Sequence, residues 1–341
     1  MCIRDRTLGV LALFVLMAYG QEKKFALYSV AFYNMENLFD TIHDEGKNDY
    51  EYLPNGTNQW NTMKYKAKLK NMSEILSLLS TDKLPMGPAI IGVSEIENYR
   101  VLEDILKQPA LADRGYQYVH YEGEDQRGVD CAFFYNPKLF ELTNSKLVPY
   151  VYINDTIHKT RGFLIASGNI AGEKMHFIVN HWPSRAAASP ARERAGEQVR
   201  AIKDSLLRED SAAKIVIMGD MNDDPMDKSM AVALGAKRKP ADVGPTDLYN
   251  PWWDTLKEGY GTLMYKGKWN LFDQIVFTGN LLGTDRSTLK FYKHEIFRRD
   301  FMFQKEGKYK GYPKRTQAGG VWLNGYSDHL PTIIYLIKEV K

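Results

Sequence analysis

Short apolar runs rich in Val, Ile, Phe and Tyr recur along this chain from residue 21 onward, and they constrain its fold more than any other feature of the sequence. Runs of this length and composition, bounded by polar and turn-forming residues, are typical of buried β-strands. They predict strands over residues 25–33, 89–93, 129–135, 163–170, 175–180, 214–218, 271–277 and 332–337.

Two segments show a helical period instead, residues 63–79 and residues 191–207, because their apolar side chains fall near one face of a helix. Several neighbouring strands have no helical pattern between them, which favours an α+β or layered sandwich fold over a strict alternation of strand and helix. No Pro/Gly/Ser-rich linker and no internal repeat divides the chain, so we expect a single domain over residues 21–341. The polar segments 41–62 and 283–317 are predicted to be long loops.

The composition is that of an ordinary globular protein, with 44% hydrophobic and 26% charged residues. A formal net charge of +3 is too small to indicate a nucleic-acid partner by itself. The chain has only two cysteines, which excludes a zinc site of the cysteine type. Cys131 lies within an apolar run, so we expect a buried, unreactive thiol.

The N-terminus carries an apolar run over residues 8–19, preceded by Arg4 and Arg6. A run of this length is shorter than the ~20 residues that a membrane-spanning helix needs. Ala18 and Gly20 supply small residues at the positions that a signal peptidase reads, which predicts a signal peptide over residues 1–20 and an exported protein, periplasmic, surface-bound or secreted. The alternative is a partly buried N-terminal helix. We expect no stable membrane insertion.

Polar side chains follow the predicted strands at the points where the strands end. They are Asn34, Glu36, Glu95, Asn180, His181, Asp220, Asn222, Asp273, Asp328 and His329. Hard oxygen ligands from several strand ends suit Mg²⁺, Mn²⁺ or Ca²⁺, whereas zinc more often takes several His or Cys ligands. In phosphoester hydrolysis a cation neutralises developing charge, a carboxylate orients or deprotonates water, and His or Asn donors hold the phosphoryl oxygens.

Each of these motifs alone has an ordinary structural explanation. The Asp220-x-Asn222 sequence is common in turns, and His181 alone is equally explained as a buried core histidine. The interpretation as a site rests on the coincidence of several strand ends that all carry the residue types one reaction needs.

Taken together, the motifs Asn34-x-Glu36-Asn37, Glu95, Asn180-His181, Gly219-Asp220-Met221-Asn222 and Ser327-Asp328-His329 resemble the endonuclease/exonuclease/phosphatase superfamily. The resemblance extends over residues 25–337. It implies an α+β fold of the DNase I type, a four-layered α/β sandwich in which helices flank two mainly antiparallel sheets, with the site at one end of the sheets. Residues 182–185, Trp-Pro-Ser-Arg, are similar to secreted bacterial members.

The resemblance also implies a metal site and the residues that form it. Glu95 would be the principal ligand, Asn34 and Asp328 would lie beside it, and Glu36 would have an outer role. Mg²⁺ is the expected cofactor, with Mn²⁺ or Ca²⁺ as alternatives.

Catalytic roles follow from the same resemblance. Asp220, helped by Asn222, would orient or deprotonate the attacking water. His181 and His329 would bind the scissile phosphate and stabilise its transition state.

Two carboxylates and two arginines complete the predicted site. Asp273 would hold His329 in the right tautomer, and Asp130 would do the same for His181. Arg127 and Arg185 are candidate substrate-binding residues that could meet phosphates, with ordinary surface charge as the alternative.

The segment from residue 290 to residue 315 has nine Lys or Arg residues against three acidic ones, interleaved with aromatic residues. This mixture suits phosphate contacts and base stacking, although a loop that packs its rings on the protein body would look the same. We therefore predict a metal-dependent phosphodiesterase, a secreted nuclease acting on DNA or RNA, and expect a monomer. The alternatives are a phosphatase or phosphodiesterase on phosphoinositide or sphingomyelin-type lipids, and a catalytically silent binding protein on the same fold.

Overall fold

The computed structural model describes residues 23–152 and 157–340 of the chain. The predicted signal peptide, residues 1–20, lies outside the described residues. No helix in the described ranges combines the length and the apolar composition that a membrane crossing requires.

A six-stranded sheet has the strand order β14-β17-β1-β2-β4-β3. Strands β1 and β2 are parallel, and every other neighbouring pair is antiparallel. The bounds are β1 Lys24–Leu38, β2 Ile90–Ile96, β3 Gln117–His120, β4 Asp130–Tyr135, β14 Lys290–Ile296 and β17 Thr332–Val340.

A seven-stranded sheet has the order β5-β6-β7-β8-β13-β10-β9. Only the β7/β8 and β10/β9 pairs are parallel in it, so both large sheets are mainly antiparallel. The bounds are β5 Phe140–Val148, β6 Phe163–Ile170, β7 Glu173–His181, β8 Lys214–Asp220, β9 Ala236–Lys237, β10 Leu248–Tyr249 and β13 Asp273–Thr278. Two small hairpins pair β11 Leu263–Tyr265 with β12 Lys268–Asn270, and β15 Gln317–Ala318 with β16 Val321–Trp322.

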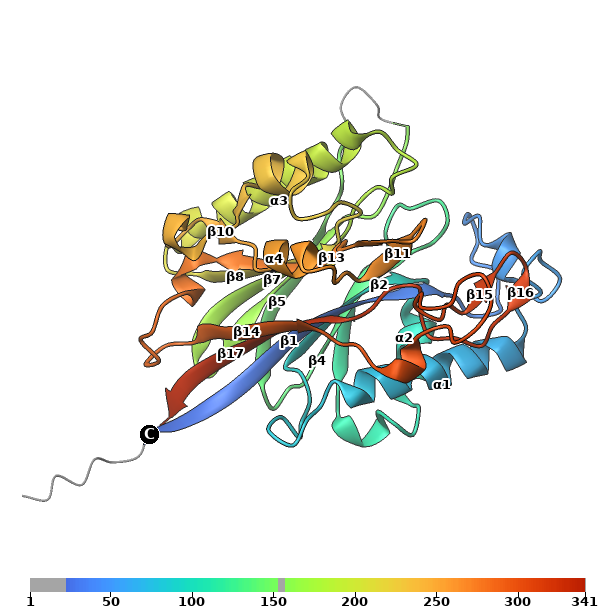
Figure 1. Ribbon diagram of the computed structural model, residues 1–341, viewed down its shortest axis with the longest axis horizontal. Helices are drawn as coiled ribbons and strands as arrows, with labels where there is room; N and C mark the ends of the chain where they lie inside the picture. The colour runs from blue at the N-terminus through green and yellow to red at the C-terminus, as the bar shows by residue number, and fades with distance from the viewer. Residues whose placement is uncertain (1–22, 153–156, 341) are drawn as a thin grey trace, which may run out of the picture.

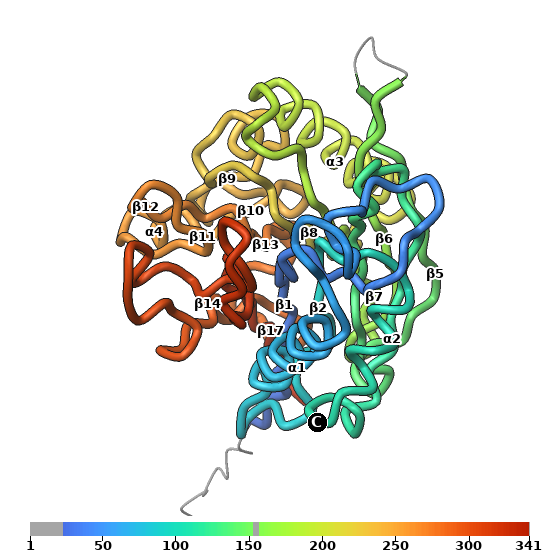
Figure 2. The backbone as a smooth tube through the Cα atoms, turned by 90° about the vertical axis from the view of Figure 1, so that its right-hand side faces the viewer, coloured from blue at the N-terminus to red at the C-terminus, as the bar shows by residue number. Residues whose placement is uncertain are grey.

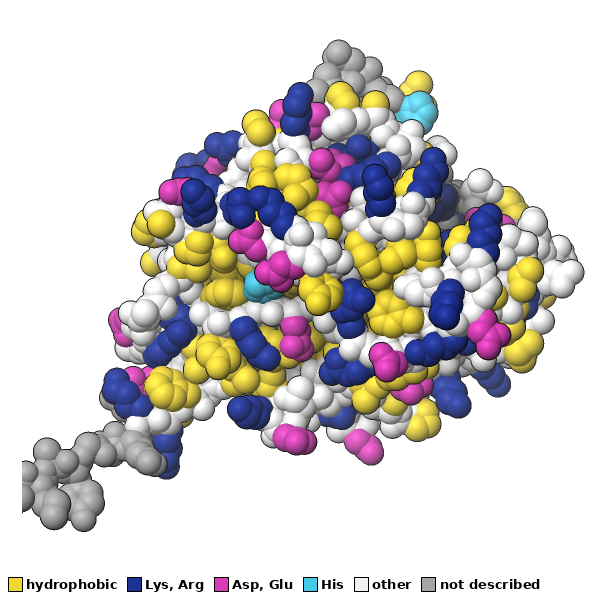
Figure 3. Space-filling model, viewed as in Figure 1, with side chains coloured by type: hydrophobic (Ala, Val, Ile, Leu, Met, Phe, Trp, Pro, Cys, Tyr) yellow, Lys and Arg dark blue, Asp and Glu magenta, His cyan; other side chains and the backbone are white. Residues whose placement is uncertain are grey.

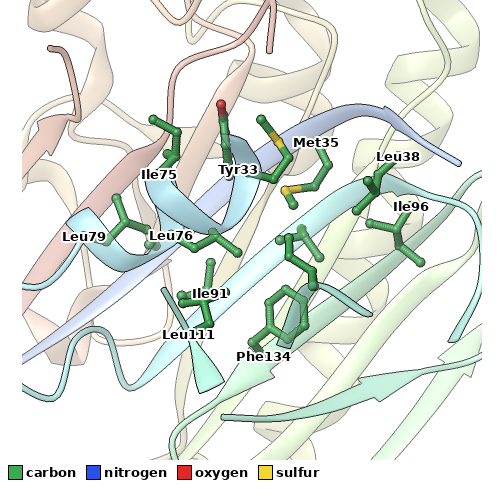
Figure 4. Packing of buried hydrophobic residues seen from close by; sticks show 14 of the residues in the cluster. Tyr33, Met35, Leu38, Ile75, Leu76, Leu79, Ile91, Ile96, Leu111 and Phe134 are labelled. Carbon is green, nitrogen blue, oxygen red and sulfur yellow. The ribbon is translucent and has the colours of Figure 1, made fainter. Parts of the chain in front are cut away.

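The described residues form three buried clusters, which separate four layers (Figures 1 and 2). Helices α1 Thr62–Leu78 and α2 Tyr99–Leu106 cover the six-stranded sheet, where Ile75 of α1 packs with Ile91 and Phe134 (Figure 4). Helix α3 Ser189–Glu209 covers the other face of the molecule, and the short helix α4 Trp252–Lys257 follows β10. The predicted four-layered sandwich of two mainly antiparallel sheets is confirmed.

The cluster between the sheets is rich in aromatic side chains. Phe32 and Phe133 come from the six-stranded sheet, and Phe177 comes from the seven-stranded sheet. The rings of Phe140 and Phe177 meet edge to face with their centres 5.4 Å apart, a geometry that adds to the hydrophobic gain of burial. Cys131 is a buried free thiol in the same cluster, and burial raises its pKa, so the thiol stays protonated as expected.

Local sequence signals set the helix ends. Helix α1 begins after Asn61, whose side chain accepts a hydrogen bond from the Lys64 N–H, and α2 begins after Asn98 in the same way. The two predicted helices agree with α1 and α3 to within two residues at each end, and each of the eight predicted strands overlaps an observed one. The prediction of one long loop over residues 283–317 is wrong, because β14 lies within it and pairs with β17.

Candidate active site

The register of the central strands brings the predicted catalytic residues together. Strands β7 and β8 are parallel, which places His181 opposite Asp220. Strand β13 is antiparallel to β8, and its first residue, Asp273, lies opposite Asp220 from the other side. In the six-stranded sheet the parallel β1/β2 pair brings Asn34 next to Ser94, directly before Glu95.

The backbone departs from regular strand geometry at this end of the sheets. Glu36, Asn37, Glu95 and Asn222 all have positive φ values, between 45° and 57°. Between Ser94 and Ile96 the pairing with β4 shifts by one residue, so Glu95 is the extra residue of a β-bulge. Non-glycine residues in the left-handed region each cost on the order of 1–3 kcal/mol and cluster at functional sites, where neighbouring contacts hold them.

Glu95 has the contacts expected of a metal ligand held ready. Its Oε1 accepts from the Asn34 amide at 3.1 Å, and its Oε2 accepts from the Asn37 N–H at 2.9 Å. Three potential ligand atoms lie within 4.8 Å of one another here: a carboxylate oxygen of Glu95, a ring nitrogen of His181 and a carboxylate oxygen of Asp220. Two carboxylates and an imidazole at this spacing fit a divalent cation.

Asn34 links the two carboxylates of the site. Its Oδ1 accepts from the Glu36 N–H at 2.8 Å, which turns the amide nitrogen toward the two carboxylates. That nitrogen donates to Glu95 at 3.1 Å and to Asp220 at 3.0 Å. In this arrangement Asn34 positions both carboxylates, and its role as a metal ligand stays a prediction.

Glu36 and Asp328 share Arg315 as an ion-pair partner. The Arg315 guanidinium donates to Glu36 Oε1 at 3.0 Å and to Asp328 Oδ2 at 2.5 Å. Glu36 also accepts from the Thr316 N–H at 2.7 Å, and the Lys68 ammonium lies 3.6 Å from it. The metal-site roles of Asp328 beside Glu95 and of Glu36 further out stay predictions.

His329 contacts Asp273 as predicted. Its Nδ1 lies 2.7 Å from Asp273 Oδ2, and its Nε2 lies 3.8 Å from Asp220 Oδ2. Burial alone would lower the pKa of His329, but the carboxylates of Asp273 and Asp220 outweigh it and raise the pKa well above the usual value. This direction favours the protonated form of His329, whose Nε2 faces Asp220.

Asp220 is buried between the two imidazoles. Burial raises its pKa to about 7, while the positive charge of His329 opposes the rise. Its Oδ1 accepts from the Asn222 N–H at 2.9 Å, and the Asn222 amide in turn donates to the Trp182 carbonyl at 3.1 Å. A carboxylate with a pKa near neutrality is suited to accept a proton from water.

His181 differs from His329 in the direction of its pKa shift. Burial, together with the positive charges of Arg161, Arg127 and His329, lowers its pKa well below the usual value. Its Nε2 lies 3.7 Å from both Glu95 and Asp220. Its Nδ1 has no hydrogen-bond partner among the described residues.

The predicted pairing of Asp130 with His181 is wrong. Asp130 Oδ2 lies 3.2 Å from His120 Nε2, and both Asp130 oxygens accept from the Gly123 N–H at 3.1 Å. The physical reason is topological: the antiparallel β3/β4 pair brings His120 beside Asp130 in one sheet, whereas His181 ends a strand of the other sheet. Asp130, His120 and Glu122 form a separate polar group.

A polar pocket of about 230 Å³ collects these groups. Arg127 lines it as predicted, and so does Arg161, which the sequence reasoning missed because no motif marks it. The Arg161 guanidinium is buried, donating to Asp125 at 2.9 Å and to the Trp182 carbonyl at 3.0 Å. The lining residues are Glu95, Arg127, Arg161, His181, Ser184, Asp220, Asn222 and His329.

Arg185 does not line this pocket. Its guanidinium forms ion pairs with Asp223, Asp224 and Asp227 at 3.3, 3.2 and 2.9 Å. It also lies 4.4 Å from the centre of the Phe272 ring. These contacts tie Arg185 to the loop after β8, and its role as a substrate-binding residue stays a prediction.

Comparison with known proteins supports the fold and the family. A model of the endonuclease/exonuclease/phosphatase family matches residues 29–338, and no curated protein matches the chain in sequence. An endonuclease/exonuclease/phosphatase family protein from Bacteroides thetaiotaomicron has a similar structure, with a TM-score of 0.57, 15% identity, and coverage of 93% of this chain and 97% of that one.

Two further structures are similar over nearly their whole length. TDP2 from D. rerio, complexed with a single-strand DNA product, has a TM-score of 0.55 at 14% identity, over 91% of this chain and 98% of that one. A mannosyl-6-phosphatase from Bacteroides thetaiotaomicron has a TM-score of 0.56 at 15% identity, over 91% and 99%. At these identities the likeness establishes the fold alone.

Proposed function

The chain belongs to the endonuclease/exonuclease/phosphatase family, and on this premise we propose that it is a divalent-metal-dependent phosphodiesterase that hydrolyses DNA or RNA. The observation that carries the proposal is the polar pocket in which Asp220, with a pKa of about 7, lies 3.7 Å from His181 and 3.8 Å from His329. Arg127 and Arg161 line the same pocket, so an anionic phosphate is the group that its charges suit.

The residues fit a resident divalent cation. Glu95 would hold it next to Asp220, which is not assigned as a ligand because it serves as the base. When bound, Mg²⁺ supplies positive charge that neutralises the charge developing on the phosphoryl oxygens.

Each of the other roles in the reaction is assigned to a side chain of the pocket. Asp220 accepts the proton of the attacking water, since its pKa lies near the working pH. His329 keeps Nδ1–H on Asp273 and donates Nε2–H to a phosphoryl oxygen, and its positive charge counts most in the transition state. Arg127 and Arg161 hold the phosphate on the opposite side.

We also propose that the protein acts after export, where extracellular DNA or RNA is the available polymer. The basic residues, apolar run and small residues at the N-terminus support this part of the proposal. The likeness to TDP2 of D. rerio, which binds a single-strand DNA product, supports the choice of a nucleic-acid substrate.

A substrate panel tests the proposed function. The purified protein from residue 21 onward is given bis(4-nitrophenyl) phosphate, 4-nitrophenyl phosphate, plasmid DNA, RNA and sphingomyelin or phosphoinositide liposomes, each with Mg²⁺ and with EDTA. We expect cleavage of the small diester and of DNA or RNA with Mg²⁺ only. Hydrolysis confined to the monoester, or headgroup release from liposomes without nucleic-acid cleavage, would show that the substrate class is wrong.

A further inference from the structure

A groove of about 810 Å³ lies beside the catalytic pocket, between the β11–β12 hairpin and residues 304–323. The walls are mostly apolar and aromatic, and hydrophobic side chains gather over β11 on the face shown in Figure 3. Among the lining residues are Leu263, Tyr265, Tyr309, Tyr312, Pro313 and Val321.

The groove borders the catalytic pocket. Asp328 lines the groove, and its Oδ1 lies 4.0 Å from Nε2 of His329, which lines the pocket. The backbone of Leu263, at the start of the hairpin, forms an antiparallel bridge with His329. The groove is therefore a neighbouring surface for a substrate whose phosphate occupies the pocket.

Two tyrosine rings stand open in this groove. Tyr265 is 62% exposed and Tyr309 is 48% exposed, unusual values for large rings at the wall of a cavity. A lysine ammonium lies near each ring, Lys266 at 5.3 Å from the Tyr265 centre and Lys308 at 5.5 Å from the Tyr309 centre. Each ring thus has a phosphate-binding cation within reach.

The two walls are fixed to each other. The Gly267 N–H, at the turn of the hairpin, donates to the Tyr312 hydroxyl at 2.6 Å. Tyr312 packs edge to face against Tyr309, with 5.4 Å between the ring centres. The open rings therefore sit on a preformed platform, and less freedom is lost on binding.

The charged residues that line the groove are of both signs. Lys266, Lys308 and Arg315 stand against Glu306 and Asp328, a net charge of +1, so the cations placed beside the open rings are the two rim lysines, Lys266 and Lys308. Open rings flanked by cations match a ligand that carries flat bases on a phosphate backbone, since base stacking and phosphate contacts are how single strands are bound.

We propose that this groove binds the single strand that flanks the scissile phosphate, with Tyr265 and Tyr309 stacking on its bases and the rim lysines meeting its phosphates. The inference rests on the proposed phosphodiesterase function, because it takes the catalytic pocket as the place where the phosphate is cut.

Binding of a fluorescein-labelled oligothymidylate, followed by anisotropy in EDTA so that nothing is cut, tests the groove. Replacing both tyrosines (Tyr265→Ala with Tyr309→Ala) should weaken binding at least about tenfold, since each stacked base contributes on the order of 1–3 kcal/mol. Replacing both with Phe keeps the rings and should keep the affinity. Tyr292→Ala, an exposed ring on β14 that does not line the groove, is the matched control.

Hydrolysis of bis(4-nitrophenyl) phosphate separates this inference from the proposed function. The small diester does not reach the groove, so the double alanine variant should hydrolyse it at the wild-type rate. Unchanged oligothymidylate binding by that variant would overturn the groove assignment even if the small diester is cleaved. Vesicles of anionic phospholipid that bind in place of the oligonucleotide, and lose binding in the variant, would assign the groove to a lipid surface instead.

Discussion

The pKa values of the two histidines beside Asp220 shift in opposite directions. Carboxylates on both sides of His329 raise its pKa, whereas burial and two arginines lower the pKa of His181. The difference comes from the charged neighbours, because the two side chains are buried to a similar extent.

Removing the charge of Asp273 should lower turnover without unfolding the site. Asp273→Asn keeps the shape of a fully buried side chain but takes away the carboxylate that holds His329 as a cation. We expect kcat for bis(4-nitrophenyl) phosphate to fall roughly 100-fold, with KM little changed, as for other partners that orient a histidine. Asp113→Asn, on the surface, serves as control. If the thermal midpoint of Asp273→Asn also fell by many degrees, the loss of kcat would instead indicate a structural role for Asp273.

The sequence was enough to predict the site residues that lie at strand ends. It was not enough to predict the residues whose side chains reach the site from other positions. His181, Asp220 and Asp273 could be predicted because pairing register alone brings them together. Arg161 and Arg315 could not, because a long side chain reaches the site from a position that no spacing marks. Asp130 was assigned to the wrong histidine because spacing does not tell which sheet a strand joins.

At the scale of elements, the strands that the sequence did not predict lie mainly at sheet edges. β3 and β14 are the outer strands of one sheet, and β5 is an outer strand of the other. Edge strands carry polar and exposed side chains, which discourage pairing with other chains and also erase the apolar pattern that marks a strand. The central strands β4, β8 and β13 are buried on both faces and were predicted, whereas the two-residue strand β10 is too short to give a pattern.

Glu173 joins elements of both sheets at the end far from the pocket. It starts β7, pairs with Lys214 of β8, and accepts from Lys338 of β17 at 2.8 Å and from the Leu289 N–H at 2.9 Å. Burial opposes the charge, but these hydrogen bonds outweigh it and lower the pKa of Glu173.

Glu173→Gln should therefore destabilise the fold in a pH-dependent way. Because the pKa is lower in the folded than in the unfolded chain, the carboxylate stabilises the fold above its unfolded pKa, and this contribution is lost as the pH falls through the folded pKa. We expect a loss of roughly 1–2 kcal/mol in the free energy of unfolding at pH 7, shrinking toward zero in acid. Urea unfolding at pH 7 and again in acid measures this loss of unfolding free energy, and the exposed Glu209→Gln variant is the control. A loss that is the same in acid would contradict the ionic origin.

At the scale of the whole molecule, the site draws on both sheets. Asn34 and Glu95 come from the six-stranded sheet, and His181, Asp220 and Asp273 come from the seven-stranded one. The aromatic cluster between the sheets fixes the distance between the two sets. A ligand that contacts both sets should therefore stabilise the entire fold.

Mg²⁺ should raise the thermal midpoint of the wild-type protein, and EDTA should reverse the rise. At a concentration 100 times the dissociation constant the gain is about 2.7 kcal/mol, which corresponds to several degrees for a chain of this size. Glu95→Gln should lose most of this shift, while Glu258→Gln, exposed after α4, should keep it. The same shift in the Glu95 variant and the wild type would show that the cation binds elsewhere.

His329 lies three residues before the start of β17, far along the chain from the other groups of the pocket. A ribosome makes Glu95, His181 and Asp220 long before it makes His329, and β1 lacks its partner β17 on one side until residues 332–340 emerge. A nascent or truncated chain thus carries an incomplete set of groups. The pocket is completed only after residue 329 has been made.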